Sequence, residues 1–401
     1  MRQMKDSGIE WIGKIPEDWA IERMKSLFTE RNERDCKGRT LLSVSQFWGI
    51  RPKSETDIAD SHIAESYDDY KEVYQGDFVM NIMLAWNGSY AVSEYDGMVS
   101  PAYCVFKFRK DCCKKYFHYL LRTNGYPTAF KTMSRGVIDS RLRLYPEQFY
   151  TFPIIIPSID EQQRIADYLD EKCVEIDSLI ALQEQMIESL KAYKQSVITE
   201  AVTKGLDPNA KLVPSGIDWI GEIPEGWKVC RIKDLVIMKS GSNLTSEQIA
   251  NEGSYPVYGG NGLRGYYEAY SNEGDYVLVG RQGALCGNIN YAFGRFWATD
   301  HAVVCYPRRN FSLIWFGETL RSMNLGQYSL SAAQPGLSVD RIREKKMPLP
   351  PLSEQQTIAS YLDEKCADID RLIALKQQKI ESLKDYKKSV IYEAVTGKTE
   401  I

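Results

Sequence analysis

The chain has 401 residues, 43% of them hydrophobic and 26% charged, which is long enough for two or three domains with cores of their own. No apolar run approaches the length of a membrane span, and the first residues lack the apolar core of a signal peptide, so we expect a cytoplasmic protein that does not cross a membrane. The net charge of −4 argues mildly against nucleic-acid binding. The nine cysteines are odd in number and show no C-x2-C spacing, so we expect neither a disulfide framework nor a metal site.

Residues 7–19, SGIEWIGKIPEDW, return as SGIDWIGEIPEGW at 215–227, and we call both copies the IPE motif. The first insert, residues 20–159, alternates apolar and turn residues between 76 and 108, as a set of short strands does. We therefore expect a mixed α/β domain here. Ten lysines and arginines against two aspartates give its 107–143 stretch a local charge of +8. Such a stretch is most often a solvated surface, but it also suits a polyanion.

Residues 160–203 and 353–396 are two copies of one sequence, identical at 32 of 44 positions. Apolar residues recur in both at three- and four-residue spacing, and neither copy contains proline or glycine. Each copy therefore predicts one helix of about 42 residues, roughly 60 Å long at 1.5 Å per residue.

The ends of these helices also carry sequence signals. Asp160 and Ser353 should cap the starts, each with a glutamine three residues on, as in a capping box. Gly205 and Gly397 stand where the helices should end.

The heptad pattern, counted with Leu169 at an a position, predicts a seam along a and d that residues at e widen. Eight of the twelve differences between the copies fall at c and f, opposite the seam, so the two helices present nearly the same inward surface. They could be separate coiled-coil arms with partners of their own. We favour an antiparallel pair within one chain, because the globular insert between the helices lets the chain return. Four lysines should interrupt the seam: Lys172, Lys365, Lys376 and Lys379.

The second insert, residues 228–352, predicts a second mixed α/β domain. GDYV at 274–277 matches GDFV at 76–79, so the two inserts look like divergent versions of one fold. Aromatic, Asn, Gln and Arg residues gather in presumed loops of both inserts. Most of these aromatic residues should be packing residues, while exposed ones beside Arg and Gln suit contacts with base edges.

No catalytic constellation stands out in the sequence. There is no glycine-rich phosphate loop of the Walker type, and the three histidines, His62, His118 and His301, are scattered and better explained by structural roles. Asp300 beside His301 is the most suggestive pair, but no nucleophile or metal-ligand set accompanies it. We therefore expect a protein that is not an enzyme and uses no cofactor.

These motifs together resemble those of the specificity subunit of type I restriction–modification systems. The most specific elements are the IPE motifs and the proline-led EQQ-I-A-x-YLD helix starts at 157–170 and 351–363. PVYGGNGLRGY at 256–266 and the segment 334–356 are also typical of such proteins. The resemblance covers essentially the whole chain.

The resemblance implies an α/β (α+β) fold in which two target-recognition domains are separated by two long, antiparallel paired helices, with a pseudo-twofold internal repeat. The implied domains are 1–159 and 206–352 for recognition, with the central helix at 160–205 and the C-terminal helix at 353–401. In this family each recognition domain contacts one half of a bipartite site in double-stranded DNA. The helices dock two methyltransferase subunits, to which restriction subunits are added, and the specificity subunit itself has no active site.

The base-contacting residues of this family vary with the target, so the resemblance transfers none of them. Residue chemistry nominates candidates for contact with DNA: Gln46, Arg51, Arg135 and Arg141 in the first insert, and Asn261, Arg264, Arg281 and Gln282 in the second. Two other classes stay open. A restriction enzyme with its own activity is disfavoured by the absence of nuclease and methyltransferase motifs, and a coiled-coil adaptor would use its inserts to bind protein or glycan.

Overall fold

In a computed structural model the chain divides into two compact units, unit 1 with Met1–Gln183 and Gln378–Ile401, and unit 2 with Glu184–Gln377. Two long helices, α5 (Ile159–Lys204) and α9 (Leu352–Val395), each contribute one part to either unit. The structure describes residues 2–34, 38–56, 67–136, 138, 141–283, 285–329 and 336–401. His62, one of the three histidines considered above, lies outside these ranges. Within them, no helix is long and apolar enough to span a bilayer.

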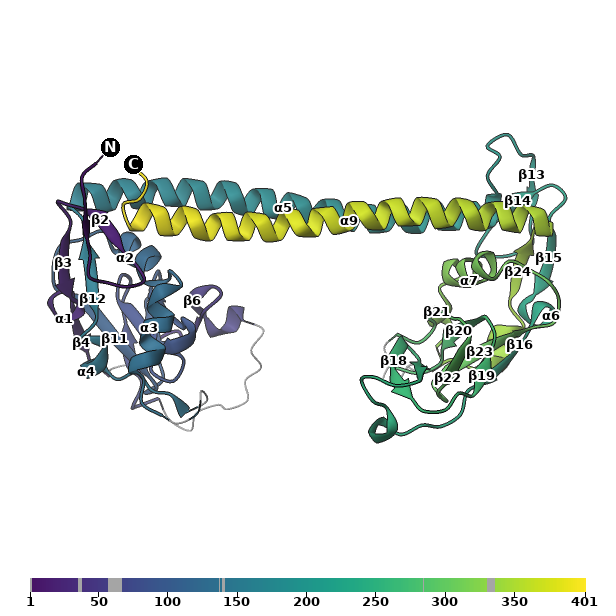
Figure 1. Ribbon diagram of the computed structural model, residues 1–401, viewed down its shortest axis with the longest axis horizontal. Helices are drawn as coiled ribbons and strands as arrows, with labels where there is room; N and C mark the ends of the chain where they lie inside the picture. Colours follow the sequence, from purple (N-terminus) through teal and green to yellow (C-terminus); the bar gives the residue numbers. More distant parts are fainter. Residues whose placement is uncertain are drawn as a thin grey trace. The chain divides into compact units, whose positions relative to one another are not determined.

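Unit 1 combines short strands with short helices. Its strands are β1 (Met4–Asp6), β2 (Lys14–Pro16), β3 (Ala20–Arg23), β4 (Phe28–Arg31), β5 (Leu42–Ser45), β6 (Gly49–Pro52), β7 (Lys71–Val73), β8 (Phe78–Asn81), β9 (Tyr90–Val92), β10 (Gly97–Val99), β11 (Tyr103–Phe108) and β12 (Pro153–Ile156). Its helices, apart from the long ones, are α1 (Met24–Leu27), α2 (Lys114–Leu121), α3 (Gly125–Met133) and α4 (Pro146–Phe149), with 3-10 turns η1 (Lys53–Glu55) and η2 (Ala85–Asn87). The main sheet is antiparallel in the order β4-β11-β8-β9, and Figure 1 labels its neighbouring strands β4 and β11.

Unit 2 repeats this composition. Its strands are β13 (Leu212–Pro214), β14 (Glu222–Pro224), β15 (Lys228–Arg231), β16 (Val236–Ser240), β17 (Tyr255–Gly259), β18 (Gly262–Tyr267), β19 (Asn272–Glu273), β20 (Tyr276–Gly280), β21 (Ile289–Ala292), β22 (Arg295–Ala298), β23 (Ala302–Pro307) and β24 (Lys346–Leu349). Its short helices are α6 (Ile232–Leu235), α7 (Leu313–Ser322) and α8 (Val339–Arg343), with 3-10 turns η4 (Ser246–Gln248) and η5 (Leu325–Tyr328). The main sheet has the order β16-β23-β20-β21.

The strand orders show that the two inserts are versions of one fold, as predicted. The sheet β4-β11-β8-β9 of unit 1 corresponds strand for strand to β16-β23-β20-β21 of unit 2. The second sheet of unit 2, β18-β17-β22-β19, has its counterpart in the pairs β5-β6 and β10-β7. A parallel bridge between Leu41 and Met98 joins those two pairs, as the parallel pairing of β17 with β22 does in unit 2.

The main core of each unit includes residues from the long helices. In unit 1 an aromatic cluster around Phe78 and Phe149 continues to Leu169 of α5 and Val395 of α9, all fully buried. In unit 2 the cluster around Trp315 likewise extends to α5 and α9. Burial of such apolar side chains stabilises each by about 1.5–3 kcal/mol. The long helices are therefore part of the packing of each unit and not only connections.

The predicted capping boxes at the helix starts are wrong. Helix α5 begins one residue before Asp160, and the backbone N–H of Glu161 donates to the hydroxyl of Ser158 at 3.4 Å, so Ser158 is the capping residue. Helix α9 follows Pro351 directly, and Ser353 lies inside its first turn. The prediction failed because the acceptor residue alone does not fix the first helical residue.

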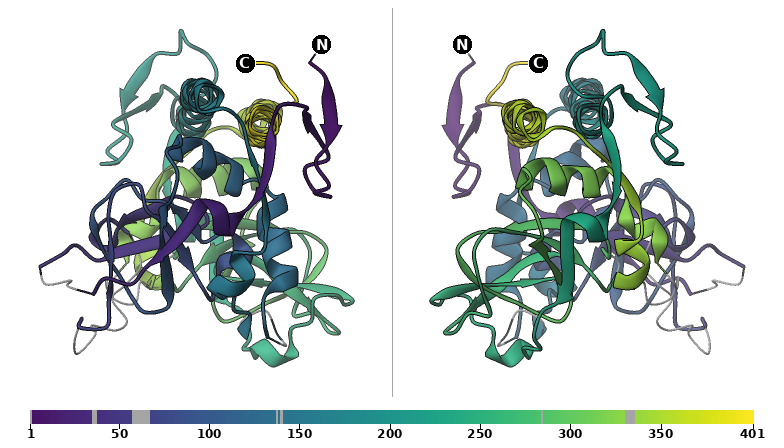
Figure 2. Two further views of the ribbon diagram at one scale, coloured as in Figure 1. Left: turned by 90° about the vertical axis from the view of Figure 1, so that its left-hand side faces the viewer. Right: turned by 90° about the vertical axis from the view of Figure 1, so that its right-hand side faces the viewer.

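The helix ends were predicted correctly, and a physical reason for the glycines is visible. Gly205 and Gly397 have φ of +75° and +69°, in the left-handed region that favours glycine. A Cβ on Gly397 would lie 2.5 Å from Pro16, and one on Gly205 would lie 2.9 Å from the carboxylate of Glu354. Figure 2 shows hairpin β1-β2 beside the end of α9 in unit 1, and β13-β14 beside the end of α5 in unit 2.

In each unit the two long helices run antiparallel against each other, which confirms the predicted pairing within one chain. Lys387 forms an ion pair with Asp177 in unit 1, and Lys194 forms one with Asp370 in unit 2, each at 2.7 Å. Asp370 and Lys387 stand 193 positions after Asp177 and Lys194 in the sequence, so the two ion pairs are the same contact made twice. The pair thus has a pseudo-twofold internal repeat.

The predicted seam is wrong in one respect: past the helix starts, where Ile165 and Ile358 at d are buried, it runs along the a and e positions and leaves d outside. Leu169 and Ile176 at a, with Cys173 and Ile187 at e, are buried, whereas Leu179, Met186 and Tyr193 at d are exposed. Spacing from a to e also alternates between three and four residues, so the sequence pattern fits both seams and only the partner helix distinguishes them. Lys172, Lys365 and Lys379 therefore lie at d positions outside the seam, and Lys376 is half-buried at an a position.

The repeated glutamate of the EQQ segment ties each helix start to an IPE motif. The indole N–H of Trp19 donates to the carboxylate of Glu161 at 2.9 Å, and that of Trp227 donates to Glu354 at 3.0 Å. Both tryptophans end an IPE motif and are buried. This hydrogen bond explains why both motifs recur together in the sequence.

The glutamine that follows makes a second connection. Gln162 and Gln355 are both buried. The side-chain carbonyl of Gln162 accepts the backbone N–H of Cys113, just before α2, and that of Gln355 accepts the N–H of Ser312, just before α7, each at 3.0 Å. Their amide groups donate to backbone carbonyls five residues earlier, at 2.9 Å. A buried amide must satisfy both of its ends, and these positions do so.

Candidate nucleic-acid interface

In both units a hairpin turn carries a residue predicted to contact DNA. Gln46 lies in the turn between β5 and β6, and Asn261 lies in the turn between β17 and β18. Both turns end at a glycine with positive φ, Gly49 at +77° and Gly262 at +96°. Because β5-β6 and β17-β18 are corresponding hairpins, the two predicted residues lie in equivalent turns of the repeat.

An exposed arginine follows each of these glycines at the same spacing. Arg51 stands two residues after Gly49, and Arg264 stands two residues after Gly262. Arg264 donates to the hydroxyl of Ser246 at 3.3 Å. An exposed guanidinium beside a protruding turn can bind phosphate or the edge of a guanine. The equivalence of the two arginines is not visible in the sequence without the structure.

In unit 2 three loops converge beside the Asn261 turn. A Cβ on Gly260 would lie 3.1 Å from the carbonyl oxygen of Gln282 and 3.3 Å from that of His301. The backbone N–H of Arg281 donates to the carbonyl of His301 at 2.8 Å. The turn between β17 and β18, the loop between β20 and β21, and the turn before β23 therefore form one edge.

A side-chain hydrogen bond orients Asn261 on this edge. The amide of Asn288 donates to the side-chain carbonyl of Asn261 at 2.7 Å. With its oxygen engaged in this way, Asn261 offers its own N–H2 group as a donor. Sequence analysis did not single out Asn288, because nothing in the local sequence connects it with the turn.

Arg281 and Gln282 also line a pocket at the same edge. Arg281 donates to the hydroxyl of Ser240 at 3.1 Å, and its carbonyl accepts from Leu337 at 2.9 Å. Gln282 pairs with Gly336 in an isolated bridge, and residues 336–340 complete the lining. The structure thus brings Asn261, Arg281 and Gln282 together, with Arg264 on the adjoining strand.

In unit 1 the four predicted residues lie on two different segments. Gln46 and Arg51 belong to the β5-β6 hairpin, whereas Arg135 and Arg141 are exposed on the loop between α3 and α4. Arg135 bridges to Arg143 through two backbone hydrogen bonds of 2.9 Å, so the described part of this loop is a short ribbon. Both segments lie against the loop between β8 and β9. A Cβ on Gly88 would lie 3.7 Å from the Cβ of Gln46, and the N–H of Leu144 donates to the carbonyl of Ile82 at 3.0 Å.

Much of the basic 107–143 stretch is structural, which corrects the interpretation of its charge. Lys110 pairs with Glu22 and Lys115 with Asp170, while Arg109 donates to the carbonyl of Phe28. The guanidinium of Arg122 is largely buried and donates to two carbonyls, those of Tyr90 at 2.9 Å and Gln46 at 2.6 Å. Burial lowers the pKa of Arg122. The residues of the stretch that stay exposed at the candidate interface include Arg135 and Arg141.

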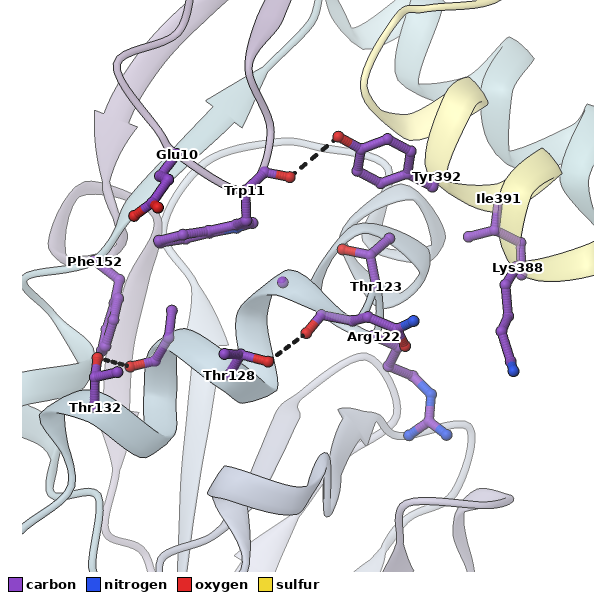
Figure 3. A pocket seen from close by; sticks show the side chains of 13 residues that line it. Glu10, Trp11, Arg122, Thr123, Thr128, Thr132, Phe152, Lys388, Ile391 and Tyr392 are labelled. Atoms are coloured by element: carbon purple, nitrogen blue, oxygen red, sulfur yellow. Dashed lines mark hydrogen bonds between the residues drawn. The ribbon is translucent and has the colours of Figure 1, made fainter. Parts of the chain in front are cut away.

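A pocket in unit 1 lies between the first IPE motif, α3 and the end of α9 (Figure 3). Trp11 and Phe152 give it apolar walls, and the hydroxyl of Tyr392 donates to the carbonyl of Trp11 at 3.1 Å. The hydroxyls of Thr128 and Thr132 donate to backbone carbonyls of their own helix region at 3.1 and 2.7 Å. Among the described residues that line this pocket, none forms a nucleophile–base pair.

The histidines of the described chain make no catalytic site. His118 is half-buried against α5, and burial lowers its pKa to about 4. His301 stands 4.0 Å from the carboxylate of Asp300, and both side chains are nearly half exposed. Within the described ranges, no cluster of His, Cys, Asp or Glu has the arrangement of a metal site.

A family model described as type I restriction modification DNA specificity domain matches the chain twice, over residues 16–192 and 224–385. The chain belongs to this DNA specificity family. Each match begins within an IPE motif and ends inside a long helix, so one copy of the family domain corresponds to one copy of the repeat. DNA target recognition is thus the function of this specificity chain, and the alternative of an adaptor for protein or glycan has no support.

Two curated relatives illustrate how the similarity is distributed. The specificity subunit of the type I restriction enzyme EcoprrI of Escherichia coli is 40% identical over 134 residues, which is 32% of this chain and 33% of the relative. The specificity subunit of the type I restriction enzyme MjaVIII of Methanocaldococcus jannaschii is 22% identical over 428 aligned positions, covering 97% of this chain and 94% of the relative. The higher identity to the first relative covers a third of the chain, while the weaker similarity to the second covers nearly all of it.

Solved structures share the fold of this specificity chain. A chain from a study of complex assembly and conformational transition of the type I restriction–modification system superposes with a TM-score of 0.72 at 18% identity, covering 96% of this chain and 99% of the other. The HsdS subunit of Thermoanaerobacter tengcongensis superposes with a TM-score of 0.53 at 17% identity, covering 96% and 98%. These likenesses confirm the predicted fold class.

Proposed function

We propose that this specificity chain recognises a bipartite sequence in double-stranded DNA, with each unit contacting one half. The observation that carries the proposal is the pair of corresponding hairpin turns, which present different exposed residues at the same place in one repeated fold. A fold that is repeated with different loops suits a target whose two halves differ in sequence. Domains joined by a spacer can contact two groove faces of the duplex about 34–36 Å apart or a multiple of that distance.

Eight side chains are our candidates for these contacts. They are Gln46, Arg51, Arg135 and Arg141 in unit 1, and Asn261, Arg264, Arg281 and Gln282 in unit 2. A bidentate contact with a base edge is worth about 1–3 kcal/mol of discrimination, so its loss should relax one base position of the motif. A phosphate contact should instead weaken binding to all sequences alike and lower the salt dependence.

We also propose that the paired helices dock two methyltransferase subunits, through which restriction subunits join the complex. Support comes from exposed apolar side chains that both copies of the long helix present at matching positions. Leu182 and its counterpart Leu375 are 50% and 55% exposed, and Tyr193 and its counterpart Tyr386 are 58% and 57% exposed. Large apolar side chains that are exposed in both copies of a repeat suit a protein interface. Two equal patches on one chain suit two copies of one partner.

In this proposal the chain contributes recognition and the partners contribute chemistry. The specificity subunit is non-catalytic, and a methyltransferase must take the target adenine out of the duplex to modify it. The chain has a net charge of −4, so part of the neutralisation of phosphates has to come from the partner subunits.

Binding measured at several salt concentrations tests the proposal. The chain, purified together with its methyltransferase, should bind duplex DNA with an affinity that falls steeply as salt rises. Alanine at the four candidate positions of one unit should degrade recognition of one half of the motif and leave the other half intact. Unchanged affinity and motif in both quadruple variants would refute our assignment of the interface.

The docking proposal has a matched control on the same helix. Leu182→Asp and Leu375→Asp should each remove one methyltransferase from the complex, as measured by mass in solution. Val174→Asp places the same charge at an exposed position outside the repeated patch and should leave two subunits bound, since its counterpart in the other copy is alanine. Loss of both subunits in either single variant would contradict two independent docking patches.

A further inference from the structure

Backbone hydrogen bonds allow the candidate edges of the two units to be compared residue by residue. The N–H of Ile82 donates to the carbonyl of Ala102 at 3.0 Å in unit 1, and the N–H of Arg281 donates to that of His301 at 2.8 Å in unit 2. A second pair of bonds agrees with this match, from Leu144 to Ile82 and from Leu337 to Arg281. Ile82 therefore corresponds to Arg281, and Ala102 corresponds to His301.

The edge of unit 2 is polar at these positions. Asn261, Arg281 and Gln282 lie beside the turn that carries Asp300 and His301. The side chain of His301 is 43% exposed, and that of Asp300 is 47% exposed. Asn, Gln, Arg and His side chains all present donors or acceptors that match the edges of base pairs in the major groove. His301, which the proposed interface leaves without a role, is thus a fourth hydrogen-bonding group on the same edge.

The edge of unit 1 is apolar at the corresponding positions. Ile82 and Met83 are followed by Leu84, whose side chain is exposed, and Pro101 stands where unit 2 has Asp300. The neighbouring turn carries Phe47, which at 79% is the most exposed large apolar side chain among the described residues.

The turn that carries Phe47 is held in place from beneath. Arg122 donates to the carbonyl of Gln46 at 2.6 Å and to that of Tyr90 at 2.9 Å, and its own side chain is largely buried. Gly88 packs beside this turn, where a Cβ on it would lie 3.7 Å from the Cβ of Gln46. A large apolar side chain on a fixed, exposed turn costs solvation unless a partner covers it. The apolar groups that DNA offers in its major groove are the methyl groups of thymine.

We propose that the two units recognise their half-sites by different chemistry. Unit 1 contacts thymine methyl groups through Phe47 and Leu84, and unit 2 forms hydrogen bonds to base edges in which His301 joins Asn261, Arg281 and Gln282. The inference rests on the proposed function and deepens it, because it assigns a class of base contact to each half of the target.

Base analogues in the duplex test this assignment directly. The probe is a duplex that carries the motif found for this chain, bound by the chain together with its methyltransferase. Uracil in place of thymine removes one methyl group and should weaken binding about fourfold per contacted methyl in the first half, since burial of one such group is worth about 0.8 kcal/mol. A 7-deazapurine removes a major-groove acceptor and should weaken binding about tenfold in the second half. Each analogue placed in the other half should change binding less than twofold, roughly within the scatter of such contacts.

Side-chain variants connect the effects to the named residues. Phe47→Ala and Leu84→Ala should abolish the response to uracil in the first half without changing the response to 7-deazapurine in the second. His301→Ala should remove specificity at one position of the second half, and His301→Asn should restore part of it, because Asn also donates and accepts. Phe293→Ala removes another exposed aromatic ring, 58% exposed, from the turn between β21 and β22 and should leave both responses unchanged.

The outcomes separate this inference from the function on which it rests. If the complex binds no duplex in a salt-sensitive manner, both are overturned. Sequence-specific binding in which the two halves respond equally to both analogues overturns the difference in chemistry alone. A first half-site that contains no thymine has the same consequence.

Discussion

Replacing Glu161 or Glu354 with glutamine should affect two equivalent helix starts by different amounts. Both carboxylates accept a hydrogen bond from a tryptophan, but Glu161 also pairs with Arg2, whose guanidinium lies 5.8 Å from the centre of the Trp19 ring. The hydrogen bond to Glu161 raises the pKa of Arg2. Ahead of the second IPE motif, Ala210 stands in the place of Arg2, 208 positions later.

The magnitudes follow from these partners. Glutamine still accepts from the indole, so Glu354→Gln should cost less than about 1 kcal/mol. Glu161→Gln also leaves Arg2 without its buried partner, and since Arg2 is partly exposed and keeps Asp18, we expect about 2 kcal/mol. The difference of about 1 kcal/mol is the contribution of Arg2.

Hydrogen exchange followed by mass spectrometry measures the two sites separately, which matters because the chain has two units that need not unfold together. Peptides covering 13–19 and 159–166 report on the first site, and peptides covering 221–227 and 352–359 report on the second. In an Arg2→Ala background the two glutamine variants should cost the same. Equal costs in the native background, or a difference that survives Arg2→Ala, would refute the role assigned to Arg2.

Three further predictions concern spacing, modularity and pH. Deleting one heptad from both α5 and α9 should change the number of unspecified bases between the half-sites and leave the recognised bases unchanged, because the chain joins the two units through these helices; a methylated motif with unchanged spacing would disprove it. Replacing residues 228–352 with the matching region of a related protein should change one half of the motif only, as methylation mapping would reveal. Burial lowers the pKa of His118 to about 4 in the folded state. As pH falls, the unfolded state therefore takes up the proton first, and unit 1 should lose up to about 3 kcal/mol of stability between pH 6.5 and 4. Denaturant unfolding of a His118→Gln variant should lack most of this loss, and an unchanged pH profile would rule out His118 as its cause.

The repeated sequence was sufficient to predict the long helices, their antiparallel pairing and the common fold of the inserts. The helices follow from the apolar spacing within each copy, and the common fold follows from the matching GDFV and GDYV segments. The pairing follows from the shared inward surface of the two copies and from the insert between them. The seam was predicted less well, because apolar Leu179 and Met186 at d positions look like seam residues and are exposed. Apolar periodicity cannot distinguish a face that packs within the chain from one that is left for a partner.

The residue types of the candidate interface were predictable from the sequence, but which of these residues lie side by side was not. Gln46 and Asn261 were predicted as loop residues, and the equivalence of their turns follows only from the strand pairings. The charge of the 107–143 stretch was misleading because Arg122 and Lys115 are engaged with groups distant in sequence. Such tertiary partners leave no periodic or local signal, and the same is true of the convergence of His301 with Arg281.

The most direct test of bipartite recognition is a map of methylated adenines in a genome that expresses this chain with its methyltransferase. We expect one motif made of two specified half-sites, separated by a fixed number of unspecified bases, that disappears when the chain is deleted. A single uninterrupted motif, or methylation that persists without the chain, would contradict the proposal that its two units recognise the two halves of the target.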